Sequence, residues 1–247
     1  MRRAGLFAAA AFALITGQAL AADLPRKAPP APLPPPPFSW TGFYVGIHGG
    51  AGWGTGDPTL LAFTGGPPFN VPLGQVQANG WLVGGTIGYN WQANPWLVLG
   101  VEGEFTWNNI EGTSACLGGG GGFSCTGEGN WKGDLTGRIG FSVDRALIYL
   151  KGGVVWANTD YTFTFNPGTP FSFTTSDTRV GGLLGAGVEY AFLPNWSAKI
   201  EYNYMDFGTQ TETFATANII APVNIAVDIR QVEHAVKFGV NYRFNWR

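Results

Sequence analysis

From Trp40 onward the chain alternates apolar and polar positions with a period of two, which indicates β-strands with two different faces. The stretch KFGVNYRFNWR, residues 237–247, shows the pattern clearly. The connections between these strands are alternately long and short. This is the layout of an all-β, antiparallel up-and-down transmembrane barrel with short periplasmic turns and four long extracellular loops. We expect eight strands, over residues 41–53, 80–91, 97–109, 130–142, 147–160, 178–190, 196–207 and 230–246.

The two faces of the predicted strands differ in chemistry. One face carries aliphatic and aromatic side chains, such as Phe238, Val240 and Tyr242, and we expect it to contact lipid. A register slip of one residue would turn seven bases to lipid at roughly 2–4 kcal/mol each near the midplane, which in sum rivals or exceeds the roughly 5–15 kcal/mol that stabilises a typical fold. The other face carries those seven bases and six acids, which we expect to fill the lumen as a charge network: Glu102, Glu104, Lys132, Asp134, Arg138, Lys151, Arg179, Glu189, Lys199, Glu201, Glu233, Lys237 and Arg243.

The tryptophans support the same arrangement, because tryptophan prefers the two interfaces of a membrane. We expect one girdle beside the long loops, formed by Trp53, Trp81, Trp107, Trp131 and Trp156. We expect a second girdle at the opposite strand ends, formed by Trp40, Trp91, Trp96, Trp196 and Trp246. All ten tryptophans of the chain therefore lie at a predicted membrane boundary.

Beyond the loop-side girdle the apolar positions change to the inward face, while neighbours such as Gln77, Thr162 and Asp228 point outward. Strands in water bury their apolar face, so we expect the barrel to project beyond the membrane with an apolar interior. Two interpretations remain open: a packed plug that blocks the lumen, or a pocket for an apolar ligand. The predicted inward residues are Val76, Ala78, Ile110, Tyr161, Phe163, Phe165, Phe171, Phe173, Phe207, Val223, Ile225, Val227 and Ile229.

Composition and the amino terminus indicate the compartment. Only 12% of the residues are charged, against about 25% in a typical soluble domain, while 15% are aromatic and 38 are glycine. Residues 1–21 combine a basic start, an apolar stretch and an Ala-Leu-Ala site, the pattern of a secretory signal peptide for export through the Sec pathway. Its removal leaves twelve Lys and Arg against sixteen Asp and Glu. This balance predicts no nucleic-acid partner.

Residues 22–38 hold eight of the seventeen prolines. Such a segment favours polyproline II and cannot join a sheet, so we predict a stiff periplasmic spacer, with a docking site for a periplasmic partner as the alternative. Residues 39–247 then form the outer-membrane barrel. The long loops carry acids but no Lys or Arg between the strands as drawn, which suits a hydrated surface, with weak divalent-cation binding as the alternative.

Two cysteines and two histidines are the remaining candidates for chemistry. Cys116 and Cys125 flank a glycine run in the second long loop, and export favours a disulfide between them. A metal site is the weaker alternative, because two thiolates without a nearby histidine are a poor ligand set. No serine lies two positions from His48 or His234 on the same face. We therefore predict no catalytic site, no enzymatic activity, no cofactor and no metal.

Several stretches, SWTGFYVG at 39–46, VEYAFLPNWSAKIEYNYMDFG at 188–208 and VKFGVNYRF at 236–244, carry a family resemblance. The chain resembles the alphaproteobacterial outer-membrane immunogenic or porin-family proteins, small surface-antigen barrels of the OmpA-like type. The resemblance implies a Gram-negative outer-membrane protein without enzymatic activity that contributes to envelope integrity, adhesion or immune contact. Family members commonly end on an aromatic residue read by the barrel-assembly machinery. Here Arg247 follows Trp246, so recognition is either weaker or tolerates one extra residue.

Three classes of function remain. The leading prediction is a structural and surface-interaction barrel that contacts outer-membrane lipid and lipopolysaccharide, with loops that meet host or other surface ligands. The second is a narrow porin or channel for small solutes, which eight strands with a charge-filled lumen disfavour. The third is a lipid-modifying enzyme, which the absence of a Ser–His arrangement disfavours.

Overall fold

The computed structural model describes residues 38–63, 66, 70–116, 122–165, 171–216 and 223–244. The predicted signal peptide and nearly all of the predicted spacer lie outside these residues. The described part holds no helix that is long and apolar enough to cross a membrane. Its strands are β1 (Gly42–Phe63), β2 (Val71–Pro72), β3 (Val76–Gln92), β4 (Leu97–Asn108), β5 (Glu111–Cys116), β6 (Phe123–Val143), β7 (Ala146–Phe165), β8 (Phe171–Tyr190), β9 (Trp196–Thr216) and β10 (Val223–Phe244).

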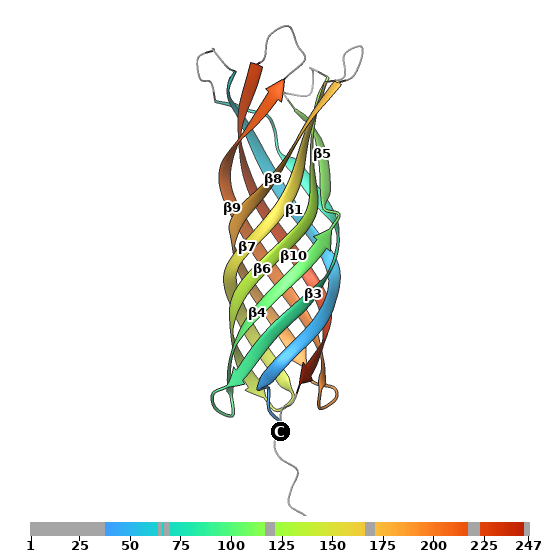
Figure 1. The fold of residues 1–247 in the computed structure, drawn as a ribbon, viewed down its shortest axis with the longest axis vertical. Coiled ribbons are helices and arrows are strands. Elements are labelled where there is room, and N and C mark those ends of the chain that lie inside the picture. Colours follow the sequence, from blue (N-terminus) through green and yellow to red (C-terminus); the bar gives the residue numbers. More distant parts are fainter. Residues whose placement is uncertain are drawn as a thin grey trace, which may run out of the picture. The chain divides into compact units, whose positions relative to one another are not determined.

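Eight of these strands close into a ring of antiparallel neighbours, in the order β1, β3, β4, β6, β7, β8, β9 and β10 (Figure 1). The ring closes at β1, where Phe43 pairs with Tyr89 of β3 on one side and with Phe244 of β10 on the other. Closure leaves no unpaired strand edge in the membrane-spanning part of the ring, whereas in the extension the pairing of β8 with β9 stops at Gly182 and Asp206. The prediction of an eight-stranded, up-and-down antiparallel barrel is confirmed.

The two ends of the barrel differ in how well the predicted strand bounds match. At the short-turn end the strands begin and end within two residues of the predicted bounds, as at Gln92, Leu97 and Val143. At the other end the strands continue far beyond the loop-side tryptophans: β1 runs past Trp53 to Phe63. The predicted bounds were too short here because they followed the lipid-facing alternation, whereas strand pairing continues after lipid gives way to water.

Two short strands and three irregularities occur in this extension. β5 continues the path of β4 after a break at Asn109 and Ile110, and β2 adds a short pairing to β1. The register shifts within β6 between Gly129 and Trp131, within β10 between Arg230 and Val232, and within β1 between Leu60 and Ala62. The shift in β6 changes which positions point inward, because Cys125 is buried before it and Lys132 and Asp134 after it, whereas the buried residues of β10 keep one parity.

The outer surface of the ring is apolar between the two ends. Ile47, Leu184 and Leu150 are 72%, 67% and 62% exposed, and the same face of the other strands carries further exposed apolar side chains. Exposing such an apolar surface to water would be energetically unfavourable, whereas contact with the hydrocarbon of a membrane is favourable. The strand parity therefore places the apolar face outward.

Most predicted girdle tryptophans lie on this outer surface. Those exposed there are Trp53, Trp81, Trp91, Trp96, Trp107, Trp156 and Trp196, and Trp131 is half-buried. Trp246 lies outside the described residues. The prediction that Trp40 belongs to the short-turn girdle is wrong, because its side chain is fully buried. Trp40 precedes β1, so strand parity does not constrain it, and it packs inside the barrel end.

Candidate functional site

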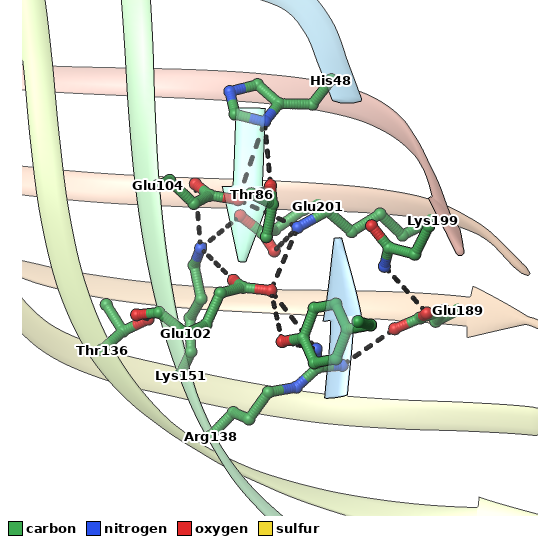
Figure 2. A network of polar contacts seen from close by, with 12 residues as sticks. His48, Thr86, Glu102, Glu104, Thr136, Arg138, Lys151, Glu189, Lys199 and Glu201 are labelled. Atoms are coloured by element: carbon green, nitrogen blue, oxygen red, sulfur yellow. Dashed lines mark hydrogen bonds and ion pairs between the residues drawn. The ribbon is translucent and has the colours of Figure 1, made fainter. Parts of the chain in front are cut away.

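Buried carboxylates and ammonium groups meet at the centre of the barrel interior (Figure 2). Glu102 of β4 and Glu201 of β9 lie 3.0 and 2.7 Å from the Nζ of Lys151 of β7. Lys199 of β9 lies 2.9 Å from Glu104 and 3.3 Å from Glu102, and Lys237 of β10 also pairs with Glu104. Three cations thus neutralise three carboxylates that come from two strands on different sides of the ring.

A second group of contacts extends this network toward the short-turn end. Arg138 of β6 lies 3.0 Å from Glu189 of β8 and 3.4 Å from Glu102, and its guanidinium stacks 3.9 Å from the centre of the Tyr149 ring. The Tyr44 hydroxyl of β1 donates to Glu102 at 2.8 Å. The network therefore links strands that are not neighbours in the ring.

β3 contributes Thr86, which donates to Glu104 at 3.1 Å, so that every strand of the ring supplies at least one member of the network. Removing one partner of a buried ion pair typically costs about 3–5 kcal/mol, because it leaves a buried charge without compensation. The structure buries all thirteen residues that the sequence analysis placed in the lumen: Glu102, Glu104, Lys132, Asp134, Arg138, Lys151, Arg179, Glu189, Lys199, Glu201, Glu233, Lys237 and Arg243.

Three members of this network could in principle ligate a metal ion. Carboxylate oxygens of Glu102, Glu104 and Glu201 lie within 4.8 Å of one another. However, Lys151 and Lys199 already occupy the space between these oxygens and neutralise them. The arrangement is that of an ion-pair cluster, and a metal would have to displace two ammonium groups.

The two histidines lie on opposite faces of the barrel wall. His48 is buried inside, with Nδ1 3.1 Å from the Thr86 hydroxyl and Nε2 3.0 Å from the Thr106 hydroxyl. His234 lies on the outer face, where its Nδ1 is 2.7 Å from the Tyr202 hydroxyl and its ring stacks on Trp53. In the described part neither ring contacts a serine, so neither forms a Ser–His pair.

An aromatic cluster fills the interior at the short-turn end. Trp40 packs with Val98, Leu147 and Tyr149, and Phe38 packs against this group. The Trp40 backbone N–H donates to the Gln92 side chain at 2.8 Å. The residues just before β1 therefore fold back into the barrel mouth. The sequence did not predict this cluster. Trp40 precedes the strand in SWTGF, and outside a strand the alternation of apolar and polar residues does not show which way a side chain points.

Two apolar layers fill the interior on the other side of the ion pairs. The nearer layer contains Leu82, Val155, Ala157, Leu183, Met205, Phe207 and Ala235. The farther layer contains Leu60, Leu73, Cys116, Cys125, Tyr161, Val227 and Ile229, with Val76 and Phe163 packed against it. The apolar interior therefore begins inside the membrane-spanning part, below the level predicted from the sequence. The sequence contained evidence for this lower start, because Val155 and Leu183 are apolar residues at inward positions of their strands.

The predicted apolar cap is described only in part. Tyr161, Phe207 and Val227 are buried, and Phe163 and Phe173 are partly buried. The side chains of Phe165, Phe171, Val223 and Ile225 lie outside the described part of the structure. Cys116 and Cys125 are joined by a disulfide, with Cα atoms 5.9 Å apart, and both sulfur-bearing residues belong to the apolar layer.

A closed antiparallel barrel with an apolar outer band, tryptophan girdles and a buried ion-pair network defines an integral outer-membrane β-barrel protein. The family model described as outer membrane protein beta-barrel domain matches residues 7–244, and the chain belongs to this family. The protein is accordingly located in the Gram-negative outer membrane, as the sequence predicted.

Two relatives from Brucella show which outer-membrane proteins the chain is similar to. The 31 kDa outer-membrane immunogenic protein of Brucella melitensis is 31% identical over 237 residues, which cover 94% of this chain and 96% of that protein. The 25 kDa outer-membrane immunogenic protein of Brucella abortus is 25% identical over 242 residues, 95% of each chain. The resemblance to the outer-membrane immunogenic proteins is thus confirmed over nearly the whole chain.

Solved structures share the fold. The outer membrane protein OprG of Pseudomonas aeruginosa superimposes with a TM-score of 0.50 at 13% identity, over 83% of this chain and 97% of its own. The outer membrane protease OmpT of Escherichia coli reaches 0.51 at 7% identity, over 82% and 97%. At these identities the likeness concerns the barrel fold alone.

Proposed function

We propose that this protein is a non-conducting structural barrel that anchors surface-exposed strands and loops in the outer membrane. The observation that carries this proposal is the ion-pair cluster of Glu102, Glu104, Glu201, Lys151 and Lys199, whose side chains are all fully buried. Eight strands leave an interior just wide enough for side chains. A cluster of this kind therefore occupies the path that a solute would take.

Apolar layers on both sides of the cluster support the same function. An ion that crosses the interior would have to pass the Trp40 cluster, the ion pairs and then two layers of buried apolar side chains. Moving a charge through such layers without compensating partners is costly. Rigid filling of this kind suits a protein whose work is done at its surface.

The extended strands and acidic loops are the proposed interaction surface. The described outer face of the extension is polar: the hydroxyls of Thr162 and Thr174 lie 2.9 Å apart, and Thr113 and Thr126 form the same pairing. We propose that this surface contacts lipopolysaccharide and host or environmental ligands, and that the protein reaches the membrane through the barrel-assembly machinery. The names of the Brucella relatives, outer-membrane immunogenic proteins, favour a surface-exposed antigen without enzymatic activity.

Single-channel recording in a planar bilayer tests the proposal. The barrel folded into detergent and reconstituted should give no conductance steps above those of the lipid alone. A Glu102→Ala/Lys151→Ala variant, which removes one charge of each sign from the centre, is the comparison for an opened interior. Reproducible steps from the unaltered protein would replace the proposal with the second candidate, a narrow channel for small solutes.

A further inference from the structure

A partly open cavity of about 70 Å³ lies inside the barrel extension, between the farther apolar layer and the polar side chains of Gln231 and Glu233. One water needs roughly 10–15 Å³ of such space, so the cavity has room for several waters or for one small organic molecule. Protein interiors are usually packed without voids much larger than a water. A space of this size therefore calls for an explanation.

The walls of the cavity are mainly apolar. Val76 of β3, Ile110, Tyr161 of β7 and Ile229 of β10 line it, together with the disulfide-bonded Cys125 of β6. Ile110 and Ile229 are only 4% and 5% exposed. A ligand in this space would be surrounded by hydrocarbon from several strands, which is the environment that favours apolar molecules.

The polar groups at the floor of the cavity are already paired with one another. The Tyr161 hydroxyl donates to Gln231 Oε1 at 2.6 Å, and Gln231 Nε2 donates to Glu233 Oε1 at 2.7 Å. Glu233 is in turn neutralised by Lys132. Burial raises the pKa of Tyr161 to about 12, so its phenol stays neutral at physiological pH. The floor therefore offers no unpaired charge to a charged ligand.

Glycines on two strands create the space. A Cβ added at Gly56 of β1 would meet nothing within 4 Å, and one at Gly127 of β6 would only touch the Tyr161 ring at 3.9 Å. By contrast, a Cβ at Gly80 would come within 1.8 Å of a backbone oxygen. Gly80 is thus required by close backbone packing, whereas Gly56 and Gly127 are not, and their effect is to leave the cavity open.

We propose that this cavity is a binding site for one small, uncharged, apolar molecule of about the size of a single aromatic ring. Apolar cavities that stay dry bind benzene-sized ligands, because the ligand restores the contacts that the lining atoms lack. The site lies outside the ion-pair cluster, so binding there does not depend on whether the interior conducts ions.

Methyl NMR with benzene as the probe tests the proposal. The barrel, labelled at isoleucine δ1 methyl groups and reconstituted in lipid nanodiscs, is titrated with benzene. Ile110 and Ile229 should show ring-current shifts that saturate. The lipid-facing methyls of Ile47 and Ile87, 72% and 62% exposed, serve as internal references and should change linearly as benzene dissolves in the lipid.

Two glycine variants provide the matched comparison. Gly56→Leu places a side chain in the cavity and should abolish the saturable shifts. Gly182→Leu is the control, because a Cβ at this exposed glycine also meets nothing within 4 Å but lies outside the cavity lining. If Gly56→Leu does not fold, Gly127→Leu takes its place.

Three results would overturn the proposal. The first is a shift at Ile110 and Ile229 that rises linearly with benzene, as for the reference methyls. The second is saturation that persists when the cavity is filled in a variant that folds. The third is equally strong saturation with benzylammonium or benzoate, because a charged ligand would mean a hydrated, polar site.

Discussion

The guanidinium carbon of Arg243, in the last strand, lies 5.1 Å from the ring centre of Trp40, which precedes the first strand. The same guanidinium stacks 4.6 Å from Phe38 and donates to the Pro194 carbonyl at 2.9 Å. This contact connects the two ends of the barrel sequence and a periplasmic turn, so that the chain entering the barrel is held by the strand that completes it.

Trp40→Ala should lower the free energy of unfolding by about 3–5 kcal/mol, because it leaves a large void in a buried aromatic cluster. Urea-induced unfolding in lipid vesicles, followed by tryptophan fluorescence and gel mobility, measures this loss. Trp96→Ala is the control at the same end, since Trp96 is 52% exposed. Equal losses in the two variants would contradict the packing of Trp40 inside the barrel.

Lys151→Met should destabilise the barrel by about 3–5 kcal/mol, because it leaves the carboxylates of Glu102, Glu104 and Glu201 with less compensation in a water-poor interior. The matched control is Arg230→Met. Arg230 is also ion-paired, with Asp206 at 3.8 Å, but its side chain is 59% exposed, so its removal should cost less than about 1 kcal/mol. Comparable costs in both variants would refute a stabilising role for the buried cluster.

Ile47→Arg should lower the free energy of unfolding by about 2–4 kcal/mol, because it places a cation in the hydrocarbon near the middle of the membrane-spanning part of β1, between Phe43 and Trp53. Gln77→Arg, on the outer face of the neighbouring strand beyond Trp81, should cost less than about 0.5 kcal/mol, because that position faces water. Unfolding titrations of both variants in vesicles locate the membrane boundary. A large loss of unfolding free energy in Gln77→Arg would place the membrane boundary nearer the loop end of the barrel than the tryptophan girdle does.

Reduction of the Cys116–Cys125 disulfide should loosen the extension without opening the membrane-spanning barrel. The bond joins β5 to the start of β6. β5 pairs with β6 along its whole length, but its register with β3 consists of the single pair Asn79 and Glu111. We expect faster amide hydrogen exchange for residues 111–116 and 123–128, and unchanged exchange for residues 132–142. The Cys116→Ser/Cys125→Ser variant should match the reduced protein. Faster exchange throughout β6 would show that the disulfide stabilises the whole barrel.

Much of the barrel follows from the sequence because each strand meets two different solvents. Period-two alternation identified eight strands, their order of connection and the inward direction of residues such as Lys151 and Glu201. Near the loop-side girdle this information weakens, because the apolar face changes sides there and bulges at Gly129 and Arg230 shift the register. Strand ends in the extension were therefore predicted too early.

The candidate site was predictable as a set of residues but not as an arrangement. Parity placed Glu102, Lys151 and Lys199 on one face, yet it carries no information about which cation approaches which carboxylate. That choice depends on strand stagger and side-chain length across the barrel. The cavity was not predictable either, because Gly56 and Gly127, which line it, come from strands far apart in the sequence.

The sequence by itself determined that the chain forms an outer-membrane barrel with an apolar exterior and a charged interior, because alternation encodes side-chain direction in every strand. Only the tertiary structure decided that Trp40 turns inward to meet Arg243, that three lysines converge on three glutamates, and that a cavity remains above them. These features depend on distances across the closed ring, and closure is a property that no single strand carries.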